Sequence, residues 1–128
     1  MRQLVLSVFL TFVSSIPVFG SSSAALDGNE ILRRCSPGLE KTDLTAMENA
    51  EYIYCMGYIA GVMDAAVFMH TMSDEKNTVW RWCGPADGIA GGQAARIVVK
   101  WLKNNPEKLH LRGDTLIIAA LHEAFPCH

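Results

Sequence analysis

The sequence predicts an all-α fold: a small disulfide-stapled bundle of four main helices, mostly antiparallel. Three observations support this prediction. Apolar residues recur at intervals of three and four along most of the 128 residues, and almost no segment alternates as a strand would. The connectors between the helical segments are short, which favours antiparallel neighbours. Four widely spaced cysteines, at positions 35, 55, 83 and 127, offer two cross-links.

The first 25 residues have the composition of a signal peptide. A single arginine precedes the apolar run from residue 4 to residue 13, and small residues dominate from 14 to 25. This order is typical of an exported chain, and we expect cleavage after Gly20 or Ala25. The apolar run is too short to span a bilayer comfortably. Residues 26–128 are therefore expected to form one exported domain that is not held in a membrane. An uncleaved anchor is the alternative.

The charge balance of residues 26–128 excludes one class of partner. Loss of the leader would remove only Arg2, which leaves ten Lys and Arg against thirteen Asp and Glu. A mildly acidic chain without a basic stripe is not expected to bind nucleic acid.

The first helix is predicted from Asp27 to Cys35. Ile31, Leu32 and Cys35 fall on one face of such a helix. Pro37 and Gly38 follow, and this pair is expected to end the helix.

The second helix is predicted to be long and to begin at a capping box. Thr45 and Glu48 have the spacing at which each side chain bonds the other residue's backbone amide. The apolar pattern then continues to about Met72.

Small residues form a stripe inside this second helix. Gly57, Gly61 and Ala65 stand four residues apart, so another backbone could approach closely. A membrane-helix contact would give the same stripe. Glu51 and Asp64 favour instead a buried helix that crosses another helix at short distance, within one subunit or between two. Asp64, a carboxylate inside an apolar helix, is expected to bond a nearby backbone amide or Arg96.

A polar segment between residues 71 and 82 is the best candidate for binding a partner. Tryptophan and arginine are enriched at binding hot spots, and a charged loop tip could enter a cleft. The alternative is that the tryptophans fold back onto the bundle near Cys83. The candidate binding residues are Asp74, Glu75, Lys76, Trp80, Arg81 and Trp82.

Two more helices complete the prediction. One runs from Gly91 to Asn105, stops at Pro106 and is followed by a short turn through Leu109. The other has Asp114 as its N-cap and ends at Pro126. Their predicted inward faces carry Ala94, Ile97, Val98, Trp101 and Leu102 in the first, and Leu116, Ile117, Ala120, Leu121 and Ala124 in the second.

The cysteines are expected to form two disulfides, for which three pairings exist. The antiparallel layout favours neighbour pairing, Cys35 with Cys55 and Cys83 with Cys127, and the closed loops are worth roughly 3 to 4 kcal/mol each. A zinc site built from the four thiols is the alternative, but no Cys-x-x-Cys pair supports it, so no metal or cofactor is expected.

Several motifs resemble the Rap/Tai immunity-protein family. They occur in the same order and at similar spacing from about Leu32 to Cys127, which makes the combination more specific than any one of them. The motifs are Cys55 to Asp64 (CMGYIAGVMD), Cys83-Gly84-Pro85, Gln93, Trp101-Leu102 with Pro106, and Ala120 to Cys127 (ALHEAFPC).

This resemblance implies a small periplasmic all-helical protein with disulfides, commonly a homodimer. Members with an assigned role bind peptidoglycan-cleaving amidase effectors of type VI secretion and block the active-site cleft. The residues that transfer are structural: the helix with Gly57, Gly61 and Asp64, the cysteines, and the Phe125-Pro126-Cys127 end.

Two positions depart from the family pattern. Ala90 stands three residues before Gln93, where the family often has Thr or Ser, so half of a capping box is missing. Gly84 replaces a larger apolar residue.

Two other functions remain as alternatives to immunity. An enzyme is not expected, because His70, His110, His122 and His128 are scattered and the sequence has neither a Gly-x-Ser-x-Gly elbow nor a Gly-rich phosphate loop. A periplasmic helical protein of another role, such as a small chaperone or an envelope-stress component, would share the scaffold.

Overall fold

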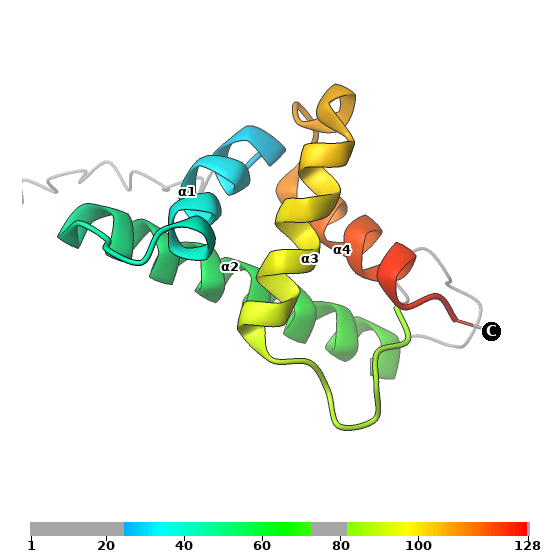
Figure 1. The fold of residues 1–128 in the computed structure, drawn as a ribbon. Coiled ribbons are helices and arrows are strands. Elements are labelled where there is room, and N and C mark those ends of the chain that lie inside the picture. The colour runs from blue at the N-terminus through cyan, green and yellow to red at the C-terminus, as the bar shows by residue number, and fades with distance from the viewer. Residues whose placement is uncertain (1–24, 73–81, 128) are drawn as a thin grey trace, which may run out of the picture.

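A computed structural model describes residues 25–72 and 82–127 (Figure 1). Within these residues the elements are four α-helices and one 3-10 turn, and no strand occurs; a single antiparallel bridge joins Asp27 to Arg112. The prediction of an all-α fold with four main helices is therefore confirmed. The elements are α1 (Gly28–Glu40), α2 (Ala46–Met72), α3 (Gly91–Asn104), η2 (Pro106–Lys108) and α4 (Gly113–Ala124).

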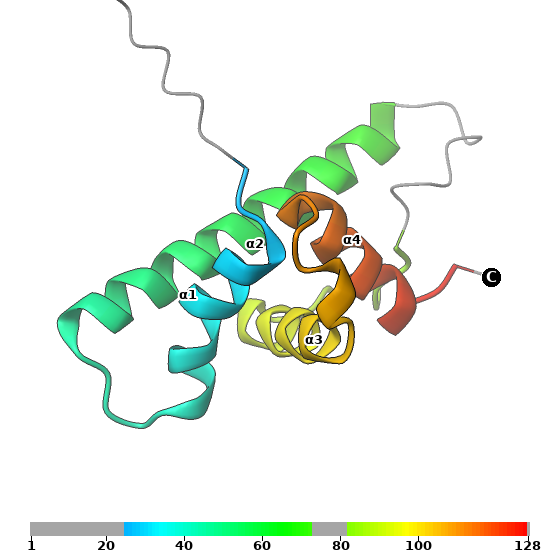
Figure 2. The ribbon, with the colours of Figure 1, turned by 90° about the horizontal axis from the view of Figure 1, so that it is seen from above.

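The longest helix, α2, lies across the other three. Residues 41–45 connect α1 back to it, and η2 connects α3 back to α4. Figures 1 and 2 show α1 along one half of α2 and the pair α3 and α4 along the other half, all on the same side. The core lies between them. Its largest fully buried side chains are Ile31, Cys35, Cys55, Ile59, Val98, Leu102, Leu116, Ile117 and Leu121.

Helix α1 is longer than the sequence predicts. The expectation that Pro37-Gly38 ends it is wrong, because Pro37 lies inside the helix and Glu40 is its last residue. Proline removes one backbone donor, but packing offsets that loss: a Cβ added at Gly38 would lie 2.1 Å from the Tyr52 ring of α2. Contact with α2 therefore holds the last turn of α1 in place.

The start of α2 is the predicted capping box. The Thr45 amide donates to Glu48 Oε2 at 2.9 Å, and the Glu48 amide donates to Thr45 Oγ1 at 3.2 Å. Lys41 also bonds the Glu48 carboxylate. These bonds, that of Lys41 first, lower the pKa of Glu48 to about 2.

Helix α3 follows the prediction, and α4 differs from it at both ends. Ala90 is the N-cap of α3 and makes no side-chain hydrogen bond there, because alanine has no polar side-chain atom. The N-cap of α4 is Arg112, not Asp114, because the Gly113 amide already bonds the carbonyl of Leu26. Ala124 ends α4 and is exposed, whereas Ile118 is buried.

Two disulfides cross-link the fold. Cys35 pairs with Cys55 across α1 and α2, with Cα atoms 5.4 Å apart, and Cys83 pairs with Cys127 with Cα atoms 5.0 Å apart. This is the neighbour pairing that the antiparallel layout favours. The first disulfide is in the core and the second is at the edge, where Cys83 is exposed.

Candidate partner-binding surface

Only one of the six candidate binding residues between 71 and 82 lies in the described part of the chain. Asp74, Glu75, Lys76, Trp80 and Arg81 fall outside the described residues. Trp82 is described, and its contacts show how the end of this segment is held.

Trp82 packs onto the C-terminal end of α4. Its ring centroid is 5.9 Å from that of Phe125, and the ring is half-buried. A Cβ added at Gly84 would lie 2.1 Å from the Trp82 ring, so a larger residue there would displace the tryptophan. The glycine that departs from the family pattern thus has a structural reason.

The backbone beside Trp82 is held at the same place. The Cys83 amide donates to the Phe125 carbonyl at 2.9 Å, and the Cys83–Cys127 disulfide lies next to this bond. The point where the segment 73–81 rejoins the fold is therefore fixed by a ring contact, a hydrogen bond and a covalent bond.

The stripe of small residues on α2 faces away from the core. Gly57 and Gly61 are exposed, and no atom would lie within 4 Å of a Cβ added at either. Within the described residues, no helix of this chain crosses the stripe. The residues of α2 that are buried, Cys55, Ile59 and Ala66, lie on its opposite side and take up the contacts with α1, α3 and α4.

Asp64 is also on the exposed part of α2. It has no hydrogen bond or ion pair with any residue in 25–72 or 82–127, so the expected bond to Arg96 or a backbone amide is wrong. A buried carboxylate would have needed such a partner. An exposed carboxylate is satisfied by water.

Large apolar side chains surround the stripe. Tyr54 is 52% exposed, Phe68 61% and Met72 72%, and Met47, Ile53, Val67 and Met69 are similarly exposed. In the part of the chain that the structure describes, α2 is the one helix long and apolar enough to cross a membrane; its best window has a mean hydropathy of 1.4 and is 17% buried.

An open groove of about 720 Å³ runs beside this face. Gly57, Gly61 and Ala65 form part of its floor, and Tyr54, Tyr58 and Met69 stand around it. Arg112 and Asp114 lie at its α4 side, joined by an ion pair of 2.6 Å. The Arg112 guanidinium lowers the pKa of Asp114, and burial raises the pKa of Tyr58. The groove is thus apolar with one ion pair at its rim.

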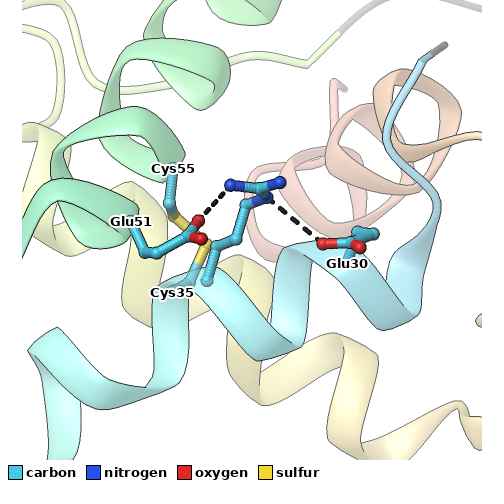
Figure 3. The surroundings of a disulfide bond; sticks show 5 residues. Glu30, Cys35, Glu51 and Cys55 are labelled. Carbon is cyan, nitrogen blue, oxygen red and sulfur yellow. Dashed lines mark hydrogen bonds and ion pairs between the residues drawn. A yellow bond between two sulfur atoms is a disulfide. The ribbon is translucent and has the colours of Figure 1, made fainter. Parts of the chain in front are cut away.

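A cluster of charges covers the inner disulfide on the side of α1 and α2. Figure 3 shows Glu30 and Cys35 on α1 beside Glu51 and Cys55 on α2. Arg34 bonds both carboxylates, at 3.2 Å to Glu30, and its guanidinium lies 4.8 Å from the centroid of the Tyr54 ring. The cluster is partly exposed, so its ion pairs are expected to add little to the stability of the fold.

Chemistry by a bound metal finds no support among residues 25–72 and 82–127. No three His, Cys, Asp or Glu side chains gather there in a way that could hold a metal ion, and the four cysteines are all disulfide-bonded.

A comparison with protein families assigns the chain. The profile described as Rap1a immunity proteins matches residues 27–127, which include all four α-helices of the described residues. The chain belongs to the Rap1a immunity protein family. Membership implies that the chain binds a partner effector protein. No curated protein matches the sequence.

The position of the Rap1a match agrees with the structural boundaries. It begins at Asp27, the N-cap of α1, and ends at Cys127, which closes the outer disulfide. The sequence analysis expected the domain at residues 26–128 and the resemblance from about Leu32 to Cys127. It missed the exposed side of α2, and the only signal for that side was the same stripe of small residues.

Proposed function

We propose that this Rap1a-family protein is a periplasmic immunity protein that binds a peptidoglycan amidase effector of type VI secretion and occludes its active-site cleft. Family membership over residues 27–127 is the observation that carries the proposal. The amidase and the secretion system come from the resemblance to the Rap/Tai family. Immunity requires binding and no chemistry of its own.

Export to the periplasm is supported by the disulfides. All four cysteines pair within the described residues, and such bonds persist in oxidising compartments. In this proposal residues 1–25 are the signal peptide. Cleavage after Gly20 or Ala25 leaves Leu26, which is buried and accepts a hydrogen bond from Gly113, in the mature protein.

The segment from Asp74 to Arg81 is the proposed effector-binding element. It joins Met72 to Trp82, and Trp82 is held on α4 by Phe125 and the outer disulfide. A binding loop with a rigid base loses less entropy on binding than one with free ends. In this scheme Trp80 and Arg81 contact the effector, and Trp82 anchors the base as well as bordering the interface.

The test measures amidase inhibition by the purified mature protein. An amidase encoded next to this chain is assayed on peptidoglycan with increasing amounts of the protein, and we expect full inhibition near one equivalent. The variant Trp80→Ala should weaken inhibition while leaving the thermal unfolding midpoint unchanged. Leu111→Ala, at an exposed apolar position between η2 and α4, is the matched control and should leave both unchanged.

The proposal fails if no amidase from the same cell or its competitors binds at micromolar concentration. The proposal that residues 74–81 bind the effector fails if Trp80→Ala lowers the unfolding midpoint together with inhibition, because that result assigns Trp80 to the core.

The homodimer implied by the resemblance is part of this proposal. A dimer that also occludes effectors needs a surface away from residues 74–81, so that both partners bind at once.

A further inference from the structure

We propose that the outer disulfide, Cys83–Cys127, is a redox-sensitive modification site. A protein dithiol of the Cys-x-x-Cys class reduces it in the folded chain while the inner disulfide stays intact, and the reduction releases Trp82 from the C-terminal end of α4. The reduction is independent of what the protein binds. The loss of effector binding that follows from it rests on the proposed function.

The two disulfides differ in how well a reductant can reach them. Cys35 is 1% exposed and Cys55 2%, whereas Cys83 is exposed and Cys127 is half-buried. Thiol–disulfide exchange begins when a thiolate attacks one of the two sulfurs, so its rate depends on access to them. A reductant therefore reaches the outer disulfide in the folded chain and reaches the inner one only when α1 and α2 separate.

Charged side chains add to the cover of the inner disulfide. Figure 3 shows Glu30 and Glu51 on either side of it, and Arg34 bridges the two carboxylates. The outer disulfide has no such cover among the residues that the structure describes, because no ion pair there involves residues 82–90 or 125–127. The difference in access thus comes from both burial and charge.

The two segments that the outer disulfide joins lie outside the core. Residues 82–90 precede α3 and residues 125–127 follow α4. Of the core residues in the described part of the chain, none lies in either segment; Trp82 and Ile89 are partly buried and pack against the edge of the core. Segments with few buried contacts open at a lower free energy than the core does. The reduced chain therefore remains a folded four-helix domain.

Reduction changes how Trp82 is held. The disulfide keeps residues 83 and 127 together and so maintains a high effective concentration of one segment beside the other. Without it, two contacts remain: the ring contact of Trp82 with Phe125, at 5.9 Å between centroids, and the Cys83 amide's hydrogen bond to the Phe125 carbonyl, at 2.9 Å. Both lie at the edge of the fold, so Trp82 leaves Phe125 much more often in the reduced chain.

The exchange is balanced in atoms and electrons. A thiolate of the dithiol attacks one sulfur of the outer pair, the S–S bond breaks, a mixed disulfide forms, and the other cysteine leaves as a thiolate that takes a proton from water. The second thiol of the reductant then attacks the mixed disulfide. Two electrons pass to the pair, which ends as two thiols, and the dithiol ends as a disulfide.

The first experiment measures the order of reduction in the mature protein. The chain is incubated with increasing concentrations of dithiothreitol or, in a parallel series, of thioredoxin kept reduced by its reductase. Free thiols are alkylated with N-ethylmaleimide and located by mass spectrometry. We expect labelling of positions 83 and 127 at a reductant concentration at least about tenfold below that for 35 and 55, with an unchanged circular dichroism spectrum. The proposal is overturned if all four positions label together, if 35 and 55 label first, or if thioredoxin leaves the outer pair oxidised.

A second experiment measures the release of Trp82 through the hydrogen bond beside it. Amide hydrogen exchange of Cys83, followed by NMR, should become at least about tenfold faster after reduction of the outer pair. The Leu116 amide, which donates to the Arg112 carbonyl at the start of α4, is the internal control and should change by less than about twofold. Equal protection of the Cys83 amide in both redox states would show that the disulfide does not control this contact, and would overturn the proposal.

A third experiment links the reduction to effector binding without exposing the amidase to a reductant. Cys83→Ser/Cys127→Ser stands in for the reduced state and should need at least about tenfold more protein for half-inhibition, because the binding element has lost its rigid base. Ala86→Ser, at an exposed position of the same segment, keeps the disulfide and should inhibit as the unaltered chain does.

The outcomes of the third experiment separate the two proposals. If the double serine variant inhibits as well as the unaltered chain, the link between reduction and effector binding is wrong. If the unaltered, oxidised chain inhibits no amidase, the proposed function is wrong, and the order of labelling and the Cys83 exchange rate still decide whether the outer disulfide is the redox-sensitive site.

Discussion

Removal of each disulfide separately should distinguish what the two cross-links contribute. The inner pair, Cys35–Cys55, closes a loop of 20 residues, and the outer pair, Cys83–Cys127, closes one of 44. The chain-entropy relation gives a loss of about 3.3 kcal/mol for the shorter loop and about 4 kcal/mol for the longer one. Loop length alone therefore predicts that loss of the outer pair is more destabilising.

Burial reverses this order. Cys35 is 1% exposed and Cys55 2%, so replacing both with alanine also leaves two small cavities, at about 1 kcal/mol each. The double variant Cys35→Ala/Cys55→Ala should lose about 5 kcal/mol in total. Cys83 is exposed, and the variant lacking the outer pair should lose about 4 kcal/mol. A domain of this size has roughly 5 to 15 kcal/mol of stability, so either loss is large.

Urea unfolding followed by circular dichroism measures both losses. The variants are compared with the unaltered chain at one protein concentration. The reasoning is refuted if loss of the inner pair is less destabilising than loss of the outer pair, because the cavities would then contribute nothing.

Three other outcomes follow from single contacts. Gly113→Ala should cost about 1 to 3 kcal/mol, because its Cβ would lie 2.5 Å from the Leu26 carbonyl oxygen; Gly92→Ala, with nothing nearer than 3.9 Å, is the control and should be neutral or stabilising in the same urea assay. Trp82→Ala should lower the unfolding free energy by about 2 kcal/mol because a half-buried ring leaves Phe125, and an unchanged urea midpoint would contradict that contact. The pKa of Glu48 is lowered to about 2, so the stability that its carboxylate adds is present above its ordinary pKa and is lost as the pH falls through 2. The urea midpoint of Glu48→Gln should therefore change less than that of the unaltered chain over this pH range. Parallel plots of urea midpoint against pH for the two chains would refute the assignment.

The sequence predicts those elements whose signals are local. Thr45 and Glu48 satisfy each other's amides across three residues, so the start of α2 is visible without the fold. Pro37 shows the limit of local reasoning. It weakens a helix, but the contact of Gly38 with Tyr52 comes from a residue on another helix and outweighs it.

The sequence alone does not show which way the stripe of small residues on α2 faces. Gly57 and Gly61 indicate close packing, but spacing alone does not say whether the approaching backbone belongs to the same chain. The buried side of α2 is defined by Cys55 and Ile59, and only their contacts with the other helices reveal that the glycines point outward. The tryptophans of the candidate binding segment are likewise visible in the sequence. The anchoring of Trp82 is not, because it depends on Phe125, far along the chain.

The pairing of consecutive cysteines has a consequence for how an exported chain matures. As the chain emerges from its N-terminal side, Cys35 meets Cys55 before Cys83 appears, and Cys83 then waits only for Cys127. Oxidation in order of emergence gives the native bonds directly. Maturation therefore requires an oxidant and no reshuffling of disulfides, a step that takes seconds to hours where it is needed.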